Sequence, residues 1–305
     1  MRIGLHADVF SIGPDPISEL TAAVEAASSG GLEYWLPQGF GVDALTALAA
    51  VGRDVPDARF GTFVVPTYAR HPMVMAMQAL TVQAAAGGRF TLGIGLSHRP
   101  VVERAYGLSY DTPVRHMREY LSVLVPLLHG EKVRFAGEEI TSRGFSPLAV
   151  PDVVPPPVLV AALGPQMLRV TGQHADGTVL WMVGPKTIAD HVVPTITAAA
   201  AAAGRPRPQV VAGLPVSVTA DPDEAREMAT GALALYGELP SYRAMLDREG
   251  VEGPADIAVI GDEEAVAAQL RHVVDVGATA LVVHVLGSPE DRRRTTALLC
   301  ELATP

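Results

Sequence analysis

The chain has 305 residues, of which 49% are hydrophobic and 18% are charged, so it can form a large core and is long enough for two domains or one large α/β barrel. Its formal net charge of −10 provides no broad basic surface, which argues against nucleic-acid binding. The single cysteine, Cys300, excludes an internal disulfide and a multi-cysteine metal site, and it fits a cytoplasmic protein.

The N-terminal residues run directly into IGLHADVF, without the charged and long apolar regions of a signal peptide. No stretch approaches the roughly 18 uninterrupted apolar residues that a membrane-spanning helix needs. We therefore expect a soluble protein without a membrane partner.

Short apolar runs rich in β-branched residues recur along the chain, and a longer helical pattern follows each of them. We predict eight strands, at residues 3–10, 33–40, 59–66, 90–97, 156–163, 177–184, 209–219 and 279–286. Nearly all of them are continuously apolar, which is typical of a parallel sheet covered by helices. Eight strands alternating with helices predict a (β/α)8 TIM barrel, with an open doubly wound sheet as the main alternative.

The helical segments carry recognisable start and stop signals. The first has Pro16 in its first turn and ends at Gly30 and Gly31, and two later helices have Asp221 and Asp262 as predicted N-caps. Residues 130–156, before the fifth strand, indicate a small hairpin or irregular excursion. Residues 237–261, before the eighth strand, indicate a helical and loop insertion. Neither insertion has a core of its own, so we expect lids near one end of a single domain over 1–305.

In such a barrel, catalytic groups lie where strands end and the following loops begin. This rule makes a candidate list from six strand ends: His6 and Asp8, Gln38, Thr62 through Val65, Ser97 and His98, Gly164 and Gln166, and Trp181. We expect these side chains to converge on one mouth of the barrel.

The segment GGRFTLGIGLSHRP invites a dinucleotide-binding interpretation, which its context does not support. The sixth position of the glycine pattern is His98, and the strand is the fourth rather than the first. Gly93 and Gly95 either let a flat ligand lie against the strand or relieve crowding inside the barrel, and for Gly93 crowding is the better explanation. His98 is either a general acid or base or a rim histidine bonded to a loop carbonyl. It has no second ligand beside it for a metal, so we expect no metal site.

The segment VAALGPQMLRV is predicted to run from a strand through a Gly164–Pro165 turn into a helix. The backbone N–H groups at that helix start would suit a phosphate, with Pro165 at the first position, where no N–H is needed. The alternative is that Gly-Pro serves as turn chemistry alone.

Three longer segments, EYWLPQGFGVDALTALA, GTFVVPTYARHP through GGRFTLGIGLSHRP, and VLVAALGPQMLRVTGQHADGTVLWMVGPKTI, are informative together. They resemble the luciferase-like flavin and deazaflavin barrel superfamily, and more narrowly its actinobacterial coenzyme F420-dependent oxidoreductases. The resemblance covers most of the chain. It implies coenzyme F420 as cofactor, with FMN as the alternative, and a homodimer that acts on a small-molecule substrate.

The resemblance also implies which residues hold the cofactor. The third strand would end in a bulge that supports the deazaflavin ring, with a cis peptide bond between Thr62 and Phe63. The implied cofactor-binding set is Gln38, Thr62, Phe63, Val64, Val65, Gly95, Leu96, Ala161, Ala162, Leu163, Gly164 and Pro165. Gln38 would meet the polar edge of the ring, and residues 161–165 would hold the phosphate and ribityl chain.

Two departures from the family pattern affect the chemistry. Better-known relatives have an Asp-His or Glu-His pair where this chain has Pro37-Gln38, and Gln38 can only hydrogen-bond. Some deazaflavin dehydrogenases have a proton-donating Glu where this chain has His98. We therefore take His98 as the first candidate for the catalytic acid or base, and His6 as the second.

The activity that the resemblance implies is hydride transfer between C5 of the deazaflavin and a small organic substrate. The implied direction is reduction of a C=C or C=N bond, with His98 or His6 handling the proton. Two alternatives are an FMNH2-dependent monooxygenase and a catalytically silent flavin-binding relative.

Overall fold

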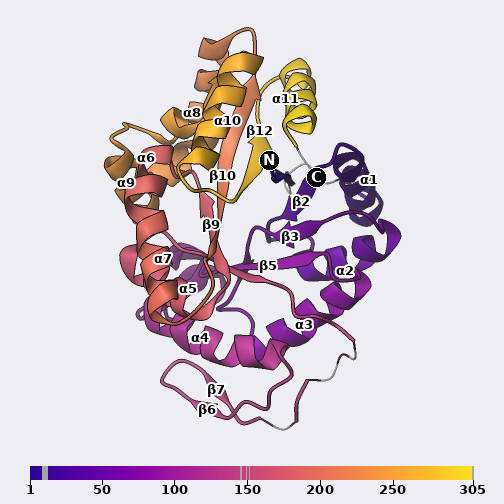
Figure 1. Ribbon diagram of the computed structural model, residues 1–305, viewed down its shortest axis with the longest axis vertical. Coiled ribbons are helices and arrows are strands. Elements are labelled where there is room, and N and C mark those ends of the chain that lie inside the picture. Colours follow the sequence, from indigo (N-terminus) through magenta and orange to yellow (C-terminus); the bar gives the residue numbers. More distant parts are fainter. Residues whose placement is uncertain (9–12, 145, 149, 151, 304–305) are drawn as a thin grey trace.

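A computed structural model describes residues 1–8, 13–144, 146–148, 150 and 152–303. Eight parallel strand positions close into a barrel surrounded by helices, which confirms the predicted fold and excludes the open sheet (Figure 1). The strands are β1 (Ile3–His6), β2 (Glu33–Leu36), β3 (Phe60–Thr62) continued by β4 (Val65–Pro66), β5 (Phe90–Gly95), β8 (Val158–Ala161), β9 (Gly177–Trp181), β10 (Gln209–Val218) and β12 (Ala280–Val285). Pairing of β9 with β10 and of β12 with β1 completes the circle.

Most strands are shorter than predicted, mainly at the carboxyl end, and β8 also begins two residues later than predicted, at Val158. β2 ends at Leu36 rather than at residue 40, and β9 ends at Trp181 rather than at residue 184. The residues beyond these ends, 37–40 and 182–184, belong to loops that follow the strands. Residues 9 and 10 of the first predicted strand lie outside the described part of the chain.

The helices pack around the outside of the barrel, as Figure 1 shows. They are α1 (Pro16–Ser29), α2 (Ala44–Asp54), α3 (Pro72–Ala85), α4 (Pro113–Leu128), α5 (Pro165–His174), α6 (Pro185–Thr187), α7 (Val193–Ala202), α8 (Pro222–Glu238), α10 (Glu263–Asp275) and α11 (Pro289–Leu302). A π-helical turn (Ile188–Val192) joins α6 to α7, and another (Val101–Ala105) follows β5. The predicted N-caps are confirmed, since Asp221 accepts from the backbone N–H of Glu224 at 3.1 Å and Asp262 from that of Ala265 at 2.9 Å.

Additional elements occupy the two segments that were predicted as insertions. Residues 130–156 contain the antiparallel hairpin of β6 (Phe135–Ala136) and β7 (Thr141–Ser142). Residues 237–261 contain α9 (Pro240–Glu249), a 3-10 turn (Pro254–Ile257) and β11 (Val259–Gly261). β11 pairs in parallel with the end of β10, a pairing that the sequence did not predict. Figure 1 shows the hairpin at the edge near α4, and α9 beside α6 and α8.

The barrel interior is filled by side chains, so it is a core and not a channel. The inner cluster consists of Trp35, Phe63, Leu159, Val179, Val211, Ala280 and Val282. Gly4 and Gly61 leave room for the fully buried Trp35 indole, and a Cβ on Gly61 would lie only 2.7 Å from Trp35 Cζ3. In the described residues, no helix has the length and apolar character needed to cross a membrane.

Candidate active site

The end of β3 forms a bulge one residue later than predicted. Thr62 Oγ1 donates to Gly93 O at 2.7 Å and accepts from Gly93 N at 2.9 Å, and Phe63 N donates to Leu36 O at 2.9 Å. The cis peptide bond lies between Phe63 and Val64, so the predicted cis bond at Thr62–Phe63 is wrong. These hydrogen bonds hold Thr62 and the Phe63 N–H in the sheet, and the chain leaves the ladder only after them.

The glycines of β5 make room for this bulge. A Cβ on Gly93 would collide with Thr62 O, and one on Gly95 would lie 2.6 Å from Val64 Cγ2 and 3.2 Å from Ala161 Cβ. Relief of crowding therefore explains both glycines. A flat ligand at this place would rest on the partly exposed Val64 side chain and not on bare strand.

The loop between β4 and α3 is fastened by its own polar and aromatic residues. The Tyr68 ring stacks on His116 with centroids 3.9 Å apart. Arg70 forms an ion pair with Asp43, the N-cap of α2. His71 accepts from the N–H of Met73 through Nδ1 and donates from Nε2 to Thr141 O at 2.9 Å. The Pro66 to Pro72 segment, which interrupts a core strand in the sequence, is thus a rigid βα loop at the mouth.

Gln38 lies in the loop after β2, and its side-chain amide holds that loop. Its Oε1 accepts from Ala44 N at 2.9 Å, and its Nε2 donates to Gly39 O at 2.8 Å and to Val42 O at 3.3 Å. Contact between Gln38 and a cofactor ring stays a prediction.

The predicted phosphate loop joins β8 to α5. Gly164 is the N-cap of α5, and no side chain caps this helix start. A Cβ on Gly164 would meet nothing within 4 Å, so the residue has open space on its Cβ side. His191 Nε2 donates to Leu163 O at 2.8 Å and holds the loop in place. Sequence reasoning missed His191 because the contact joins residues 28 positions apart.

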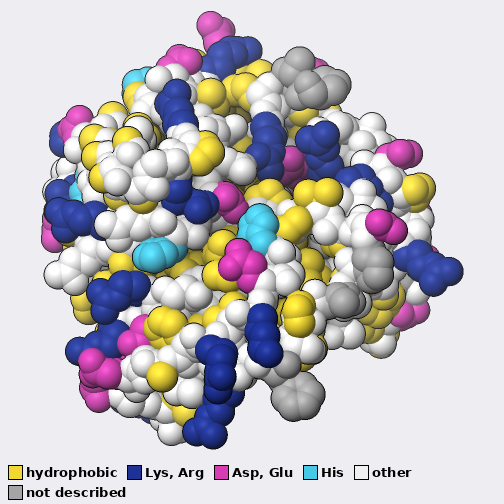
Figure 2. Space-filling model, turned by 60° about the horizontal axis from the view of Figure 1, so that its bottom comes forward, with side chains coloured by type: hydrophobic (Ala, Val, Ile, Leu, Met, Phe, Trp, Pro, Cys, Tyr) yellow, Lys and Arg dark blue, Asp and Glu magenta, His cyan; other side chains and the backbone are white. Residues whose placement is uncertain are grey.

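Aromatic rings from several strand ends and from α8 and α9 meet at the mouth. We define the mouth cluster as His6, Phe63, Trp181, Tyr236, Tyr242, His98 and His284. The His6 ring stacks on Trp181 at 5.5 Å and meets Phe63 and His284 edge-on at 5.2 and 5.3 Å. Figure 2 shows histidine side chains near the middle of one face of the molecule, next to hydrophobic ones.

The structure does not bring the two predicted catalytic histidines together. From Trp181, ring contacts continue to Tyr236 at 6.0 Å, from Tyr236 to Tyr242 at 5.1 Å, and from Tyr242 to His98 at 6.1 Å. His6 and His98 thus lie at opposite ends of a chain of rings. His284, which was not among the predicted site residues, lies one residue before the end of β12, whereas His6 is the last residue of β1.

The electrostatics of the site favour neutral histidines. Burial, and to a smaller extent His284, lower the pKa of His6 to about 3, and Asp8 opposes the shift. Burial also lowers the pKa values of His98 and His284. Near pH 7 each ring therefore carries one N–H donor and one lone pair. The enclosed Nδ1 of His6 has no hydrogen-bond partner.

Two residues at the mouth have a backbone conformation that side chains rarely adopt. Ser97, directly after β5, has φ 60°, and Met182, directly after β9, has φ 51°. Such residues cluster at functional sites, where the surrounding structure imposes them. Ser97 directly precedes His98, and Met182 directly follows Trp181, both of which belong to the mouth cluster.

The insertion helix α9 is attached to the barrel by a carboxylate. Glu249 accepts from Lys186 N at 3.0 Å and from Thr187 N at 2.7 Å, which caps the start of α6. Gly184 permits this approach, because a Cβ there would collide with the Glu249 carboxyl group. Since α9 also carries Tyr242, this contact fixes one wall of the mouth cluster.

We expect the substitution Glu249→Ala to lower the free energy of unfolding by about 1 kcal/mol, because two backbone N–H groups lose their acceptor. Urea unfolding followed by circular dichroism measures the loss. Asp247→Ala on the same helix is the matched control, since it removes only an exposed ion pair with Arg243 and should cost less than about 0.5 kcal/mol. Equal losses in the two variants would contradict the capping role of Glu249.

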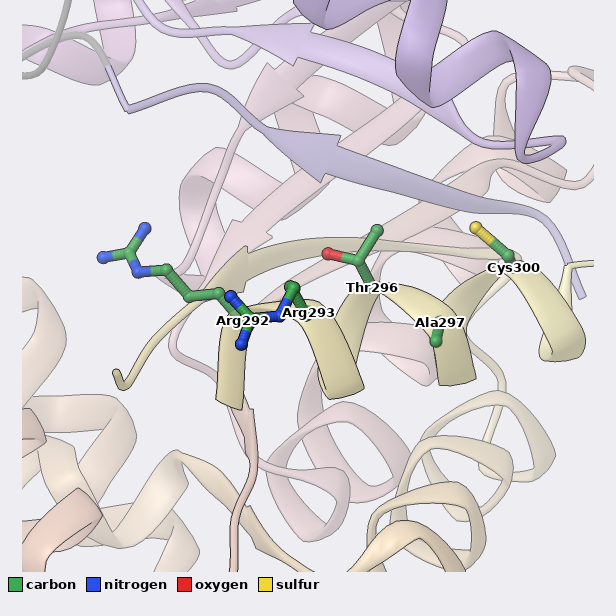
Figure 3. Close-up of a pocket in the computed structure, with 5 residues that line it drawn as sticks. All are labelled: Arg292, Arg293, Thr296, Ala297 and Cys300. Carbon is green, nitrogen blue, oxygen red and sulfur yellow. The ribbon is translucent and has the colours of Figure 1, made fainter. Parts of the chain in front are cut away.

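A depression lies on the outside of the barrel, along α11. It has a volume of about 390 Å³ and is lined by Arg292, Arg293, Thr296, Ala297 and Cys300 (Figure 3). Burial raises the pKa of the Cys300 thiol, so it is a poor nucleophile near pH 7. Within the described part of the chain, no group of three His, Cys, Asp or Glu side chains could hold a metal ion.

Several proteins have sequences similar to that of this chain. The F420-dependent glucose-6-phosphate dehydrogenase of Beutenbergia cavernae is 30% identical over 278 residues, covering 86% of this chain and 80% of that protein. An uncharacterized protein of Mycobacterium bovis is 31% identical over 204 residues, covering 62% of this chain. That alignment spans about 60% of the mycobacterial protein.

Solved structures share the fold at lower identity. The coenzyme F420-dependent tetrahydromethanopterin reductase of Methanopyrus kandleri superposes with a TM-score of 0.78 at 20% identity, covering 98% of this chain and 97% of that chain. A type II Baeyer-Villiger monooxygenase component of Pseudomonas putida in complex with FMN has a TM-score of 0.75 at 15% identity, covering 100% and 97%. The model of the luciferase-like monooxygenase family matches residues 2–280. The chain therefore belongs to the luciferase-like monooxygenase family.

Proposed function

We propose that this protein is a coenzyme F420-dependent oxidoreductase that transfers hydride between the deazaflavin and a small organic substrate. The observation that carries the proposal is that two features follow strand ends at the same mouth of the barrel. One is the partly exposed Val64 in the bulge after β3, and the other is the start of α5 after β8, which no side chain caps. The name of the Beutenbergia cavernae relative supports the choice of cofactor. When bound, F420 supplies the two-electron hydride chemistry.

The residues present fit such a cofactor. Val64, beside Gly95 and Ala161, offers an apolar surface for a flat ring, and Thr62 and Phe63 hold that surface in place. The backbone N–H groups that follow Pro165 at the start of α5 have no side-chain cap, and donors of this kind suit a phosphate. Leu96 and Leu163 would complete the binding set, and the fully buried Val65 and Ala162 would support it from the core. Gln38 would meet the ring edge from the loop after β2.

The remaining groups of the mouth would handle the substrate and its proton. Trp181 and Tyr236 provide aromatic walls that keep water away from the reacting atoms. His6 or His98 would give or take the proton that accompanies hydride transfer. The proposed direction is reduction of a C=C or C=N bond, which rests on the resemblance to actinobacterial reductases. We further propose a cytoplasmic homodimer, which light scattering of the purified protein tests.

Titration of the purified protein with F420 and with FMN, followed by fluorescence, tests the cofactor. We expect saturable binding of F420 at least about tenfold tighter than that of FMN, a difference of about 1.4 kcal/mol. Tight FMN binding without F420 binding would overturn the proposal. That outcome would support an FMNH2-dependent monooxygenase, and the FMN-bound structural neighbour is named a monooxygenase.

Oxidation of reduced F420 separates an enzyme from a silent relative. Absorbance of the deazaflavin is followed while a panel of compounds with C=C and C=N bonds is added. Binding of F420 without a change of absorbance for any compound would support a protein that only binds the cofactor.

A further inference from the structure

His6 and His284 face each other across two neighbouring strands. β1 and β12 pair in parallel with Leu5 opposite Val283, so the next residues, His6 and His284, are also opposite. Side chains alternate along a strand, and Val282 belongs to the inner cluster, so His284 points to the barrel interior as well. The two rings lie 5.3 Å apart at 84°.

Trp181 from β9 encloses this pair. Its indole stacks on His6 at 5.5 Å and 20°, and it meets His284 edge-on at 6.1 Å and 88°. Trp181 and Phe63 both pack against Gly213 of β10, where a Cβ would lie 2.5 Å from Phe63 Cζ and 3.0 Å from Trp181 Cε3. The bare glycine thus makes room for the two rings that pack around the histidines.

The enclosed pair contains a polar atom that the protein itself leaves without a partner. His6 Nδ1 is buried and has no hydrogen bond. Leaving such an atom unpaired costs about 1–3 kcal/mol, and an unpaired atom of this kind in a folded protein calls for an explanation. A ligand atom that reached this nitrogen would supply the missing partner.

We propose that His6 and His284 form one proton-handling pair, in which His6 meets the substrate and His284 positions His6 and shares its proton. The inference deepens the proposed hydride transfer and rests on it. As hydride reaches one atom of the C=C or C=N bond, the N–H bond of His6 breaks and its proton joins the other atom. In the same concerted step His6 takes a proton from His284 at its second nitrogen and His284 takes one from the solvent, so neither ring becomes an anion. A separation of 5.3 Å between rings is within reach of one bridging water.

Charged and titratable groups from each neighbouring element act on the pair. Asp8, after β1, raises the pKa values of both histidines, whereas Arg292 of α11 lowers that of His284. Tyr34 of β2 has its pKa raised to about 12 by burial and by Asp8, so it is neutral. Tyr236 of α8 meets the pair only through Trp181. A relay between two neutral rings therefore moves protons without holding a charge in the buried site.

Imidazole ¹⁵N and ¹³C NMR of the full chain without cofactor tests the pair. At pH 7 we expect His6 to be neutral and in a single tautomer, and His284→Asn to convert it to a mixture of tautomers. On acidification, His284→Asn should raise the titration midpoint of His6 by about 0.5 pH unit or more, and Asp8→Asn should lower it. His272→Asn, an exposed residue of α10, is the control and should change neither.

If His6 kept its tautomer and its titration midpoint in both His284→Asn and His284→Gln, the proposed proton-handling pair would be overturned. A packing role alone for His284 would not alter the protonation of His6. The second variant keeps the test decisive if the first does not fold. Since the measurement needs neither F420 nor FMN, its failure is distinct from a failure of the proposed cofactor.

Discussion

Replacing His6 with alanine is expected to lower the turnover of reduced F420 by at least about 100-fold, because a positioned acid or base contributes about 10²–10⁴ to such a step. The affinity for F420 should change little, since the ring contacts of His6 are with Trp181, Phe63 and His284, and Phe63 is also held by its backbone hydrogen bond to Leu36 O. Stopped-flow oxidation of reduced F420 measures the first quantity, and fluorescence titration measures the second. A loss of turnover at unchanged affinity indicates a group that acts in the transition state.

The same measurement on His98→Ala decides between the two predicted catalytic histidines. We expect a smaller loss than for His6→Ala, because the described contact of the His98 ring is with Tyr242 at the far end of the chain of rings. His6→Asn removes the imidazole with less change of volume and should match His6→Ala. A larger loss in His98→Ala than in His6→Ala would assign the proton to His98 and leave His6 as a packing residue.

The barrel itself was predictable because burial on both faces makes each of its strands continuously apolar. The same property hid the strand ends. Apolar residues such as Phe40 and Met182 continue the pattern after β2 and β9 have ended, although the chain has already left the sheet there. β11 was missed for a different reason: three residues are too few for a periodic pattern, and their partner is the distant end of β10.

The site was predictable to the level of strand ends but not of atoms. The resemblance implied a bulge at Thr62 to Val65, yet the hydrogen bonds of Thr62 to Gly93, which decide where the chain leaves the sheet, join residues 31 positions apart. Contacts of His284, His191 and Glu249 are likewise long-range. Strand-end counting would have identified His284 had it been applied to the last strand as it was to the first.

The substitution Gly164→Asp is expected to weaken F420 binding by about 30-fold or more, roughly 2 kcal/mol, while the fold remains as stable as before. Gly164 has φ −76° and ψ 154°, which any residue can adopt, and its missing Cβ faces open space. An aspartate is a favourable N-cap, so its carboxylate would accept from the first N–H groups of α5. It would thereby occupy the donors proposed for the phosphate and repel a second anion.

Two further variants at this position separate charge from shape. Gly164→Ala adds a methyl group without a charge and should leave the affinity for F420 nearly unchanged, whereas Gly164→Asn competes for the same N–H groups without repulsion and should be intermediate. Salt screens the repulsion between the two anions. A higher salt concentration should therefore reduce the difference in F420 affinity between the Asp and Ala variants. Equal affinities for Asp and Ala would place the cofactor phosphate elsewhere, because only a ligand at the start of α5 would distinguish a carboxylate from a methyl group at residue 164.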